Sequence, residues 1–542
     1  MQRWSSFPPG FKILLSIAIA VGLFFRFSNL DGKLYWHDEV YTSLRAAGYS
    51  GATIAEDLFQ NRLFTPDDLL AYQRIKPDST VIDSIESLAI EDPQHPPLYF
   101  LLARSWMHLF GSSRIASRAL PALLSLVSLP AMYLLAVELF ASPLVGGLAV
   151  MLLALSPFDI LFAQVARQYS LLTLVTIVSS WLLLRALRRP NFGNWGVYAV
   201  GSALGLYVHP FFGLSLIAHG VYALITPERR RASAFWIYPK SLTQFLGAMG
   251  VTLLLFSPWL VVLVGNFDRV LETTSWAKYG GEWLYLLKLW VLSFTSLFFD
   301  LDFGVDNWGT YALRVPFLLL IVLGLDTVTR QTTKSTKWFI ILSIFVPLLL
   351  LAVPDLIAGS RRSSITRYLI PCFPGVQLAV ACFLANIAPS PRWFRSPSWW
   401  WRGCLAFILV GSVVSCSIRA SLETWWHNIP SYFNADIARV VNTSPSPVVL
   451  SDRGYDGTQI GDLISLAYLF DSDVKLFLFD DSPAPQQIRN ILTDSQFETH
   501  FAFRMSPATI DRLAAEGWDV FEDGGFPYGG LVAVKPETPS QQ

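Results

Sequence analysis

The sequence predicts a mainly α-helical membrane protein: a polytopic helical bundle of about eleven spans with external interfacial helices, followed by a small C-terminal α/β domain outside the membrane. Hydrophobic residues make up 53% of the 542 residues and charged residues only 15%, whereas soluble domains are about a quarter charged. Apolar runs that approach the length needed to cross about 30 Å of hydrocarbon recur up to residue 420. Strand-like segments occur only after that residue. The formal net charge is zero, so nucleic acid is not an expected partner.

The predicted spans are apolar runs separated by short polar loops. They lie at residues 11–27, 116–140, 143–158, 169–187, 195–208, 210–225, 241–264, 311–327, 338–353, 368–387 and 403–420. No small-residue cleavage site follows the first run, which we therefore interpret as an uncleaved span rather than a signal peptide. Segments 97–110 and 283–299 are also apolar, but the first is short and the second carries Lys288 near its centre, so both are expected to be interfacial.

The charges of the loops predict the orientation, because short cytoplasmic loops are rich in Lys and Arg. If neither ambiguous segment crosses, the basic loops all lie inside, at residues 185–190, 226–231, 329–337 and 391–402. The first long loop, 28–96, and everything after about residue 421 then lie outside. If both segments cross, the first two basic loops move to the outside.

This organisation predicts two domains, a transmembrane domain over residues 1–420, which includes loop 28–96, and an external α/β domain over residues 421–542. Strands are expected at 446–452, 474–480, 499–506 and 530–536. Helical patterns at 459–469 and 507–516 separate some of these strands, which is typical of an α/β domain. The four cysteines lie in apolar segments and are expected to be buried hydrophobic residues rather than disulfide or metal ligands.

Two adjacent carboxylates, Asp38 and Glu39, follow the first predicted span. The short helix expected from Asp38 onward has Val40, Tyr41, Leu44 and Ala47 on one face, and Asp38, Thr42, Arg45 and Tyr49 on the other. One interpretation is structural, since carboxylates in a first helical turn cap free N–H groups and favour the helix dipole. The other is chemical: a general base, or a metal ligand, at the lipid–water boundary.

Three further segments carry polar groups that suggest a site. His95 precedes a Pro-Pro pair. Either the pair marks only the start of a helix and the histidine is incidental, or His95 belongs to a functional site. Polar residues interrupt the apolar stretch 155–172, where they line a cavity or form a short loop with a snorkelling arginine; they are Asp159, Gln164, Arg167 and Gln168. Segment 358–375 holds Arg361, Arg362 and Arg367, which either bind an anion such as phosphate or form a solvated basic loop. His209 and His219 are expected to be structural histidines.

The order of these motifs resembles a known group of enzymes. An Asp-Glu pair after the first span is followed by "HPPLYFLLARSWMHLFG", "SRIASRALPALLSL", "LLALSPFDILFAQVARQYSLL" and "RYLIPCFPG". This order is similar to that of the dolichyl-phosphate-mannose protein mannosyltransferase and aminoarabinose lipid A transferase group of the GT-C superfamily, which is glycosyltransferase family 39-like. The resemblance covers residues 10–225 and 360–375.

The resemblance implies a membrane glycosyltransferase that takes a sugar from a polyprenyl-phosphate donor and acts on the external face. The acceptor is a lipid, a glycan or a protein, and the location expected is a bacterial inner (plasma) membrane. Asp38 maps to the catalytic position, with Glu39 beside it and Tyr41 nearby. His95 maps near the donor phosphate, "ARxY" to Arg167 and Tyr169, and the later "RY" to Arg367 and Tyr368.

Some expected features differ in this sequence. Where relatives of this group carry a second acid, the sequence has Val165 and Gln168, which leaves Asp159 as the substitute. A lipid phosphate is already an activated leaving group, so no nucleotide and no obligatory nucleotide-binding metal is needed. A divalent metal ion, held by Asp38 and Glu39, is the alternative for a cofactor. The rival functions are a transporter or flippase of lipid-linked sugars and a scaffolding or acceptor-binding membrane protein.

Overall fold

The computed structural model describes residues 9–225, 240–278, 280–388, 398–454, 458–521 and 530–536. The chain forms two compact units, each built from three segments. The first consists of Met1–Leu30, Leu88–Tyr99 and Arg118–Ser421, and the second of Asp31–Ser87, Phe100–Ser117 and Leu422–Gln542. The predicted fold class, a helical membrane bundle with a small α/β part, is confirmed.

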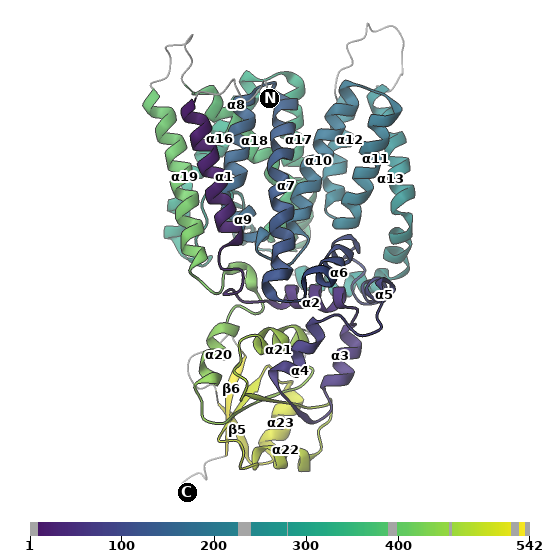
Figure 1. The fold of residues 1–542 in the computed structure, drawn as a ribbon, viewed down its shortest axis with the longest axis vertical. Helices are drawn as coiled ribbons and strands as arrows, with labels where there is room; N and C mark the ends of the chain where they lie inside the picture. The colour runs from purple at the N-terminus through teal and green to yellow at the C-terminus, as the bar shows by residue number, and fades with distance from the viewer. Residues whose placement is uncertain are drawn as a thin grey trace. The chain divides into compact units, whose positions relative to one another are not determined.

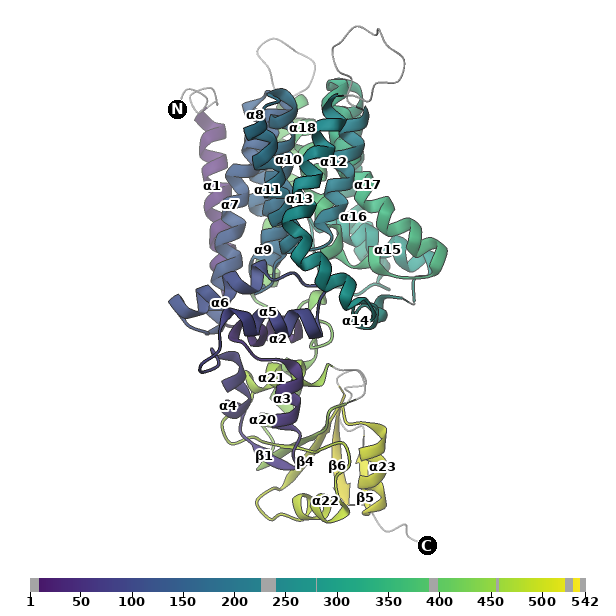
Figure 2. The same ribbon diagram turned by 90° about the vertical axis from the view of Figure 1, so that its right-hand side faces the viewer.

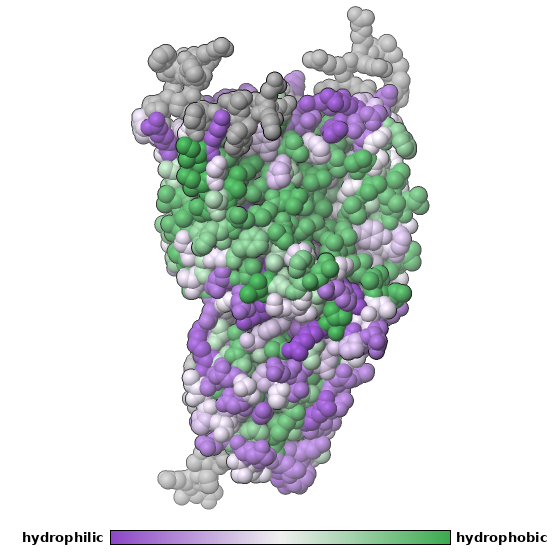
Figure 3. Space-filling model, in the orientation of Figure 1, coloured by the Kyte–Doolittle hydropathy of each residue, from purple (hydrophilic) through white to green (hydrophobic). Residues whose placement is uncertain are grey.

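Long helices make up most of the first unit (Figure 1). They are α1 (Pro9–Phe27), α7 (Arg114–Phe140), α8 (Pro143–Leu155), α9 (Pro157–Ala163), α10 (Tyr169–Arg188), α11 (Phe192–Val208), α12 (Phe212–Ile225), α13 (Lys240–Gly265), α14 (Phe267–Thr273), α15 (Trp283–Thr295), α16 (Trp308–Gln331), α17 (Lys334–Ala358), α18 (Phe373–Asn386) and α19 (Ser398–Ala420). Hydrophobic side chains dominate the face of this unit that Figure 3 shows, and many large apolar residues of α1, α7, α13, α16, α17 and α19 are exposed, as expected for surfaces in contact with lipid.

All eleven predicted spans fall on helices. In the described part of the chain, eight helices are long and apolar enough to cross a membrane, and the bent pair α8–α9 makes a ninth. The other two predicted spans correspond to α11 and α12, which have 17 and 14 residues and are short for a full crossing. The segments expected to be interfacial form α6 (Leu98–Phe110) and α15, each with 13 residues.

The span predicted at 143–158 is broken by a bend of 56° between α8 and α9. Pro157 cannot donate a backbone hydrogen bond and therefore begins a new helix. The Ser156 side chain accepts from the N–H of Asp159 at 3.3 Å and caps this new helix. The break therefore turns α9, and the turn at 164–168 that follows it, away from the axis of α8.

Successive long helices of the first unit run in opposite directions (Figure 2). The turns at 164–168 and 209–211 and the segment 359–372 therefore lie at one end of this unit, opposite the turns at 189–191 and 332–333. The predicted basic loop 226–231 and most of 391–402 lie outside the described residues. Which end faces the cytoplasm stays a prediction.

A buried arginine ties α1 to its neighbours. Arg26 is fully buried and donates to the Ser125 hydroxyl of α7 at 2.9 Å and to the carbonyl of Leu153 in α8 at 3.0 Å. Gly22, one turn earlier, faces the carbonyl of Ala154 so closely that a Cβ would overlap it. The absence of a side chain at Gly22 therefore allows α1 to approach α8, and Arg26 holds the contact by hydrogen bonds.

The second unit combines helices from the first long loop with the C-terminal segment. Its helices are α2 (His37–Ala47), α3 (Gly51–Leu58), α4 (Pro66–Leu70), most of α5 (Val81–Glu91) and of α6, α20 (Asn434–Asn442), α21 (Gln459–Ala467), α22 (Pro485–Leu492) and α23 (Pro507–Ala515). Its strands are β1 (Arg62–Phe64), β2 (Pro447–Ser451), β3 (Lys475–Leu478), β4 (Thr499–Phe503), β5 (Trp518–Phe521) and β6 (Leu531–Pro536).

These strands form one sheet in the order β1-β3-β2-β4-β6-β5. Strand β2 is parallel to β3 and to β4, and the remaining pairs are antiparallel. The four predicted strands correspond to β2, β3, β4 and β6. The sequence prediction missed β5 and β1, and β1 comes from the first loop and pairs with β3 in the register Arg62↔Leu478.

Candidate functional site

Helix α2 carries the two adjacent carboxylates in its first turn. Trp36 precedes the helix in an extended conformation, and Gly48, at φ +93°, ends it in the left-handed region that glycine adopts without strain. The Glu39 carboxylate accepts from the backbone N–H of Trp36 at 3.4 Å, which is the structural role foreseen for a carboxylate in a first turn. Glu39 is fully buried, whereas Asp38 is partly exposed.

The faces of α2 only partly follow the prediction. Val40, Leu44 and Ala47 are fully buried as expected, but Thr42 and Arg45 of the predicted polar face are buried as well. The physical reason is that other parts of the second unit, among them α21 and the 3-10 turn at 71–73, also pack on this helix. Tyr41 is partly buried, and its ring lies 5.0 Å from the guanidinium carbon of Arg45.

The other end of α2 is held by a buried cation. Arg104 of α6 donates to the carbonyl of Ala46 at 3.0 Å and to that of Ser79 at 2.7 Å. A cation at a helix C-terminus is favoured by the unsatisfied carbonyls and by the helix dipole. The helix that presents Asp38 is therefore fixed at its C-terminal end as well.

The carboxylate pair does not form a complete metal-binding set. Within the described residues, no group of three or more His, Cys, Asp and Glu side chains could hold a metal ion. The Glu39 carboxylate is buried at the start of its own helix, so Asp38 lacks a second carboxylate directed outward beside it. These residues therefore do not fit a divalent metal site.

In the first unit, three basic side chains from separate segments come together; we call His95, Arg167 and Arg367 the basic cluster. His95 Nδ1 lies 3.0 Å from a carboxylate oxygen of Asp92, and its Nε2 lies 3.1 Å from Nη2 of Arg167. Arg167 belongs to the turn between α9 and α10. The sequence suggested His95 and Arg167, but Asp92, which orients the imidazole, was missed.

Tyr169 joins the two arginines of the basic cluster. The guanidinium carbons of Arg167 and Arg367 lie 5.8 Å and 5.9 Å from the centre of its ring, a distance at which a cation is attracted to an aromatic face. Arg367 also lies 5.7 Å from the ring of Tyr368. Two like charges beside one buried ring repel each other, so the arrangement favours the binding of an anion between or beside them.

His209 also belongs with these residues, although a purely structural role was expected for it. Its ring centre lies 6.4 Å from that of His95 and 6.3 Å from that of Tyr368. Its Nδ1 accepts from the N–H of Phe211 at 3.1 Å, which leaves the proton on Nε2. Burial, and next the neighbouring His95, Arg167 and Arg367 side chains, hold the pKa of His209 well below its usual value, so His209 is neutral at physiological pH.

Gln168, between Arg167 and Tyr169, has no side-chain partner. The residue is fully buried, and in the described part of the chain neither its amide nitrogen nor its amide oxygen makes a hydrogen bond. An unsatisfied buried polar group costs about 1–3 kcal/mol. Gln168, which is next to Arg167 in the chain, therefore offers a donor and an acceptor to a polar ligand.

The segment that carries Arg367 is braced by two helices. Asp355, fully buried near the end of α17, accepts from the hydroxyl of Ser360 and the N–H of Ser363. Trp290 and Ser293 of α15 bond to Ser363 and Thr366 at 3.1 Å and 2.8 Å. Asp355 was not predicted from the sequence, because its partners come from the turn that follows the helix.

The three arginines of this segment do not act together. Arg361 donates to the carbonyl of Trp276 at 3.0 Å and stacks on the Trp276 ring. None of the described contacts joins Arg362 to the basic cluster. Of the three candidates, Arg367 is the one that lies with His95 and Arg167.

Asp159 has different surroundings from the basic cluster. It is buried, accepts from Nε2 of Gln377 at 2.8 Å, and lines a small internal cavity with Arg26, Ser125 and Ser170. These contacts tie α9 to α18 inside the helical bundle. They support a structural role for Asp159 rather than that of the second acid.

Residues 94–262 match the family described as dolichyl-phosphate-mannose-protein mannosyltransferase (PMT_2), a match that includes His95, Arg167 and Tyr169. A search of curated protein sequences finds no match. The fold is similar to that of ArnT from Cupriavidus metallidurans bound to undecaprenyl phosphate, with a TM-score of 0.53, 14% identity, and coverage of 96% of this chain and 97% of that chain.

Two further structures are similar. The apo state of the same ArnT gives a TM-score of 0.52 with 14% identity, covering 96% of this chain and 97% of that one. The apo oligosaccharyltransferase of Archaeoglobus fulgidus gives a TM-score of 0.46 with 14% identity, covering 86% of this chain and 64% of that one. At 14% identity, the likeness to the two ArnT structures establishes the fold and not the substrate.

The family match and the shared fold support one class of protein, a GT-C superfamily glycosyltransferase. The resemblance predicted from the order of motifs is thereby confirmed.

Proposed function

We propose that the chain moves a sugar from a polyprenyl-phosphate donor to an acceptor hydroxyl on the external face of a bacterial inner membrane, with inversion at the anomeric carbon. The observation that carries the proposal is the basic cluster, in which His95 and Arg167 lie within hydrogen-bond distance and Arg367 lies beside Tyr169. Guanidinium groups suit phosphate because they offer forked donors and a permanent charge. ArnT, whose fold is similar, has been solved with undecaprenyl phosphate bound.

Asp38 is the proposed general base. The acceptor oxygen attacks C1 of the sugar while the bond from C1 to the phosphate oxygen breaks, and its electron pair leaves with the phosphate. The hydroxyl proton passes to the Asp38 carboxylate. Because the attack occurs on the face opposite the leaving phosphate, the configuration at C1 inverts.

The other site residues have supporting roles in this proposal. The basic cluster stabilises the charge that develops on the departing phosphate, and preorganised donors of this kind contribute about 3 kcal/mol each in a site that excludes water. Gln168 supplies a further donor to the ligand. Glu39, which holds the first turn of α2, supports Asp38 rather than taking the proton itself. The acceptor hydroxyl belongs to a lipid, a glycan or a protein.

The test uses the full-length protein in liposomes with a panel of labelled undecaprenyl-phosphate sugars, including mannose and aminoarabinose. Asp38→Asn is expected to lower kcat about 10²- to 10⁴-fold, because an amide cannot accept the proton. Asp31→Asn is the matched control: this carboxylate of the same loop is exposed and pairs with Arg114 at 2.9 Å, so near-normal activity is expected. The proposal fails if folded Asp38→Asn protein transfers sugar normally. It also fails if the donor crosses the bilayer with its sugar–phosphate bond intact, which would indicate a flippase.

A further inference from the structure

Helix α21 of the C-terminal segment packs directly against the first turn of α2. Gly461 of α21 faces His37 and Tyr41 so closely that a Cβ at this position would overlap the His37 imidazole and press on the Tyr41 ring. All of these residues belong to the second unit. A side chain at position 461 would force the His37 and Tyr41 side chains to shift, so glycine lets α21 lie this close to the helix that presents Asp38 without displacing them.

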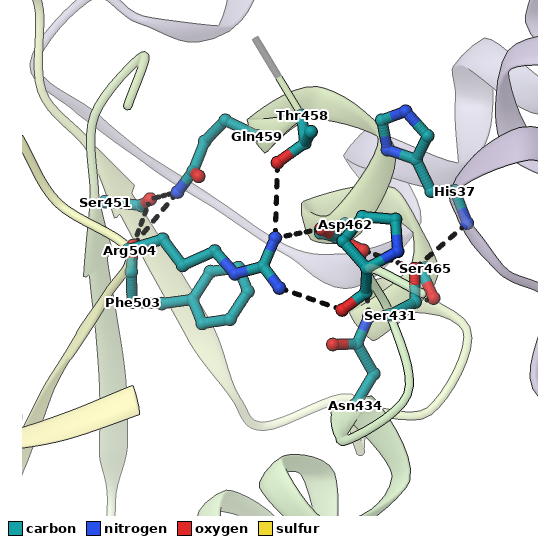
Figure 4. A network of polar contacts seen from close by, with 11 residues as sticks. His37, Ser431, Asn434, Ser451, Thr458, Gln459, Asp462, Ser465, Phe503 and Arg504 are labelled. Carbon is teal, nitrogen blue, oxygen red and sulfur yellow. Dashed lines mark hydrogen bonds and ion pairs between the residues drawn. The ribbon is translucent and has the colours of Figure 1, made fainter. Parts of the chain in front are cut away.

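The residue after Gly461 is a fully buried carboxylate, Asp462. Figure 4 shows its surroundings: it accepts from the hydroxyl of Ser431 and from the guanidinium group of Arg504, and Asn434 Nδ2 lies 3.5 Å away. Ser431 is itself fully buried, and its oxygen accepts from the backbone N–H of His37 at 3.0 Å. A hydrogen-bonded chain therefore runs from Arg504 through Asp462 and Ser431 to the backbone of His37.

The direction of each hydrogen bond in this chain is fixed. A hydroxyl has only one O–H to donate, and that of Ser431 donates to the Asp462 carboxylate. The Ser431 oxygen can therefore act toward His37 only as an acceptor, through its lone pairs. Arg504 balances the buried negative charge and is itself held by the carbonyl of Pro430 at 2.9 Å and the hydroxyl of Thr458 at 3.2 Å. Bonds that involve ionised groups are shorter and stronger than neutral ones.

The acceptor that Ser431 provides has a specific effect on α2. The first N–H groups of a helix have no partner within the helix and take their acceptors from elsewhere. His37 is the first residue of α2, and its N–H is bound by Ser431, a residue almost four hundred positions later in the chain. Because Asp38 is the next residue, the position of this N–H determines where the first turn, and with it the Asp38 side chain, lies.

We infer that Asp462 is a positioning residue for Asp38: through Ser431 it holds the backbone of His37 and so fixes the carboxylate that takes the acceptor proton. The inference rests on the proposed function, because it assigns a purpose to the placement of Asp38. It also gives the C-terminal segment a part in catalysis without contact with the reacting atoms. Small errors in the position of a catalytic group lower the rate about 10- to 100-fold.

Three variants test the inference in the full-length protein: Ser431→Ala, Asp462→Asn and Gly461→Ala. The matched control is Asp452→Asn, since Asp452 is equally buried in the same unit but binds Ser506 and Thr509 at the start of α23. Gly461→Ala is informative because alanine is a better helix former than glycine, so a loss cannot come from helix propensity. Readouts are kcat and KM with the most active undecaprenyl-phosphate sugar, melting temperature, and hydrogen exchange of residues 36–47.

The three variants are expected to lower kcat about 10-fold or more, to leave KM for the donor within about 2-fold, and to raise exchange in the first turn of α2. Asp452→Asn is expected to lower the melting temperature without a selective loss of kcat. The inference is overturned if the three variants keep normal kcat, or if Asp452→Asn loses as much kcat at an equal loss of stability. Asp38→Asn, assayed in parallel, separates the two hypotheses: full activity there overturns the proposed function, whatever the other variants do.

Discussion

Three arginines of similar appearance in the sequence have different partners in the folded chain. Arg167 and Arg367 lie beside Tyr169, at 5.8 Å and 5.9 Å from its ring centre. Arg361, six residues before Arg367, donates to the carbonyl of Trp276 instead. A guanidinium group that already donates to a backbone carbonyl has fewer N–H groups left for an incoming anion. Alanine variants at the three positions therefore test which arginines bind the lipid phosphate.

Replacement of Arg167 or Arg367 by alanine is expected to weaken binding of undecaprenyl phosphate about 10- to 100-fold, because a hydrogen bond to a charged group contributes about 1.5–3 kcal/mol. Arg361→Ala is expected to change the affinity by less than about 3-fold. Equilibrium binding of labelled undecaprenyl phosphate to the purified protein measures all three. Equal losses at the three positions would show that the whole basic segment, rather than the basic cluster, attracts the lipid phosphate.

At the scale of the element, the segment after α17 depends on one buried carboxylate. The Asp355 carboxylate accepts hydrogen bonds from Ser360 and Ser363, and these two bonds hold the turn that leads to Arg367. Asp355→Ala leaves both donors without their acceptor, at a cost of about 1–3 kcal/mol. Hydrogen exchange over residues 359–368 is expected to rise, and binding of undecaprenyl phosphate to weaken.

The control for this prediction is Asp326→Ala in the neighbouring helix α16. Asp326 is exposed and pairs with Arg330 at 2.6 Å, and exposed ion pairs contribute about 0.2–1 kcal/mol. The control should leave both readouts near their normal values. Unchanged exchange in Asp355→Ala would mean that Trp290 and Ser293 hold the segment without help.

The elements that the sequence predicts well are those with a strong local pattern. Each of the eleven apolar runs found by hydropathy is helical in the structure, because a span must be apolar over most of its length. Four strands are found because they are apolar runs bounded by turn residues. Strand β1 has no such signal, since it has three residues in a polar loop and exists only because β3 offers an edge to pair with.

The residues of the candidate site were likewise predicted only where a local pattern marks them. Asp38, His95, Arg167 and Arg367 are suggested by residue type and by their order in the chain, which are local properties. The separate roles of Asp38 and Glu39 depend on a backbone N–H at Trp36, and those of Arg361 and Arg367 on Trp276 and Tyr169. Trp36 lies only three residues before Glu39, whereas Trp276 and Tyr169 are distant in the chain from Arg361 and Arg367, and such distant partners cannot be predicted from one sequence.

At the scale of the whole molecule, the second unit is built from three segments of the chain. Strand β1 pairs with β3, and α21 packs against α2, α3 and α4 of the first loop. Every residue of α21 from Gln459 to Ala467 is buried, including Leu463 and Ile464 at 0% exposure. The predicted external domain over residues 421–542 would therefore lack, on its own, the helices that cover α21 and the strand that covers the edge of β3.

The isolated fragment 422–542 is accordingly expected to unfold with a broad, weakly cooperative transition and to bind a hydrophobic dye, because the apolar face of α21 is left open to water. A single chain that joins residues 31–87 to 422–542 through a Gly/Ser linker restores α2, α3, α4 and β1, and is expected to melt cooperatively with little dye binding. Circular dichroism during heating and dye fluorescence measure both fragments. A sharp transition without dye binding in the short fragment would mean that the sheet and its C-terminal helices are sufficient, and that the first loop is added to a domain already folded.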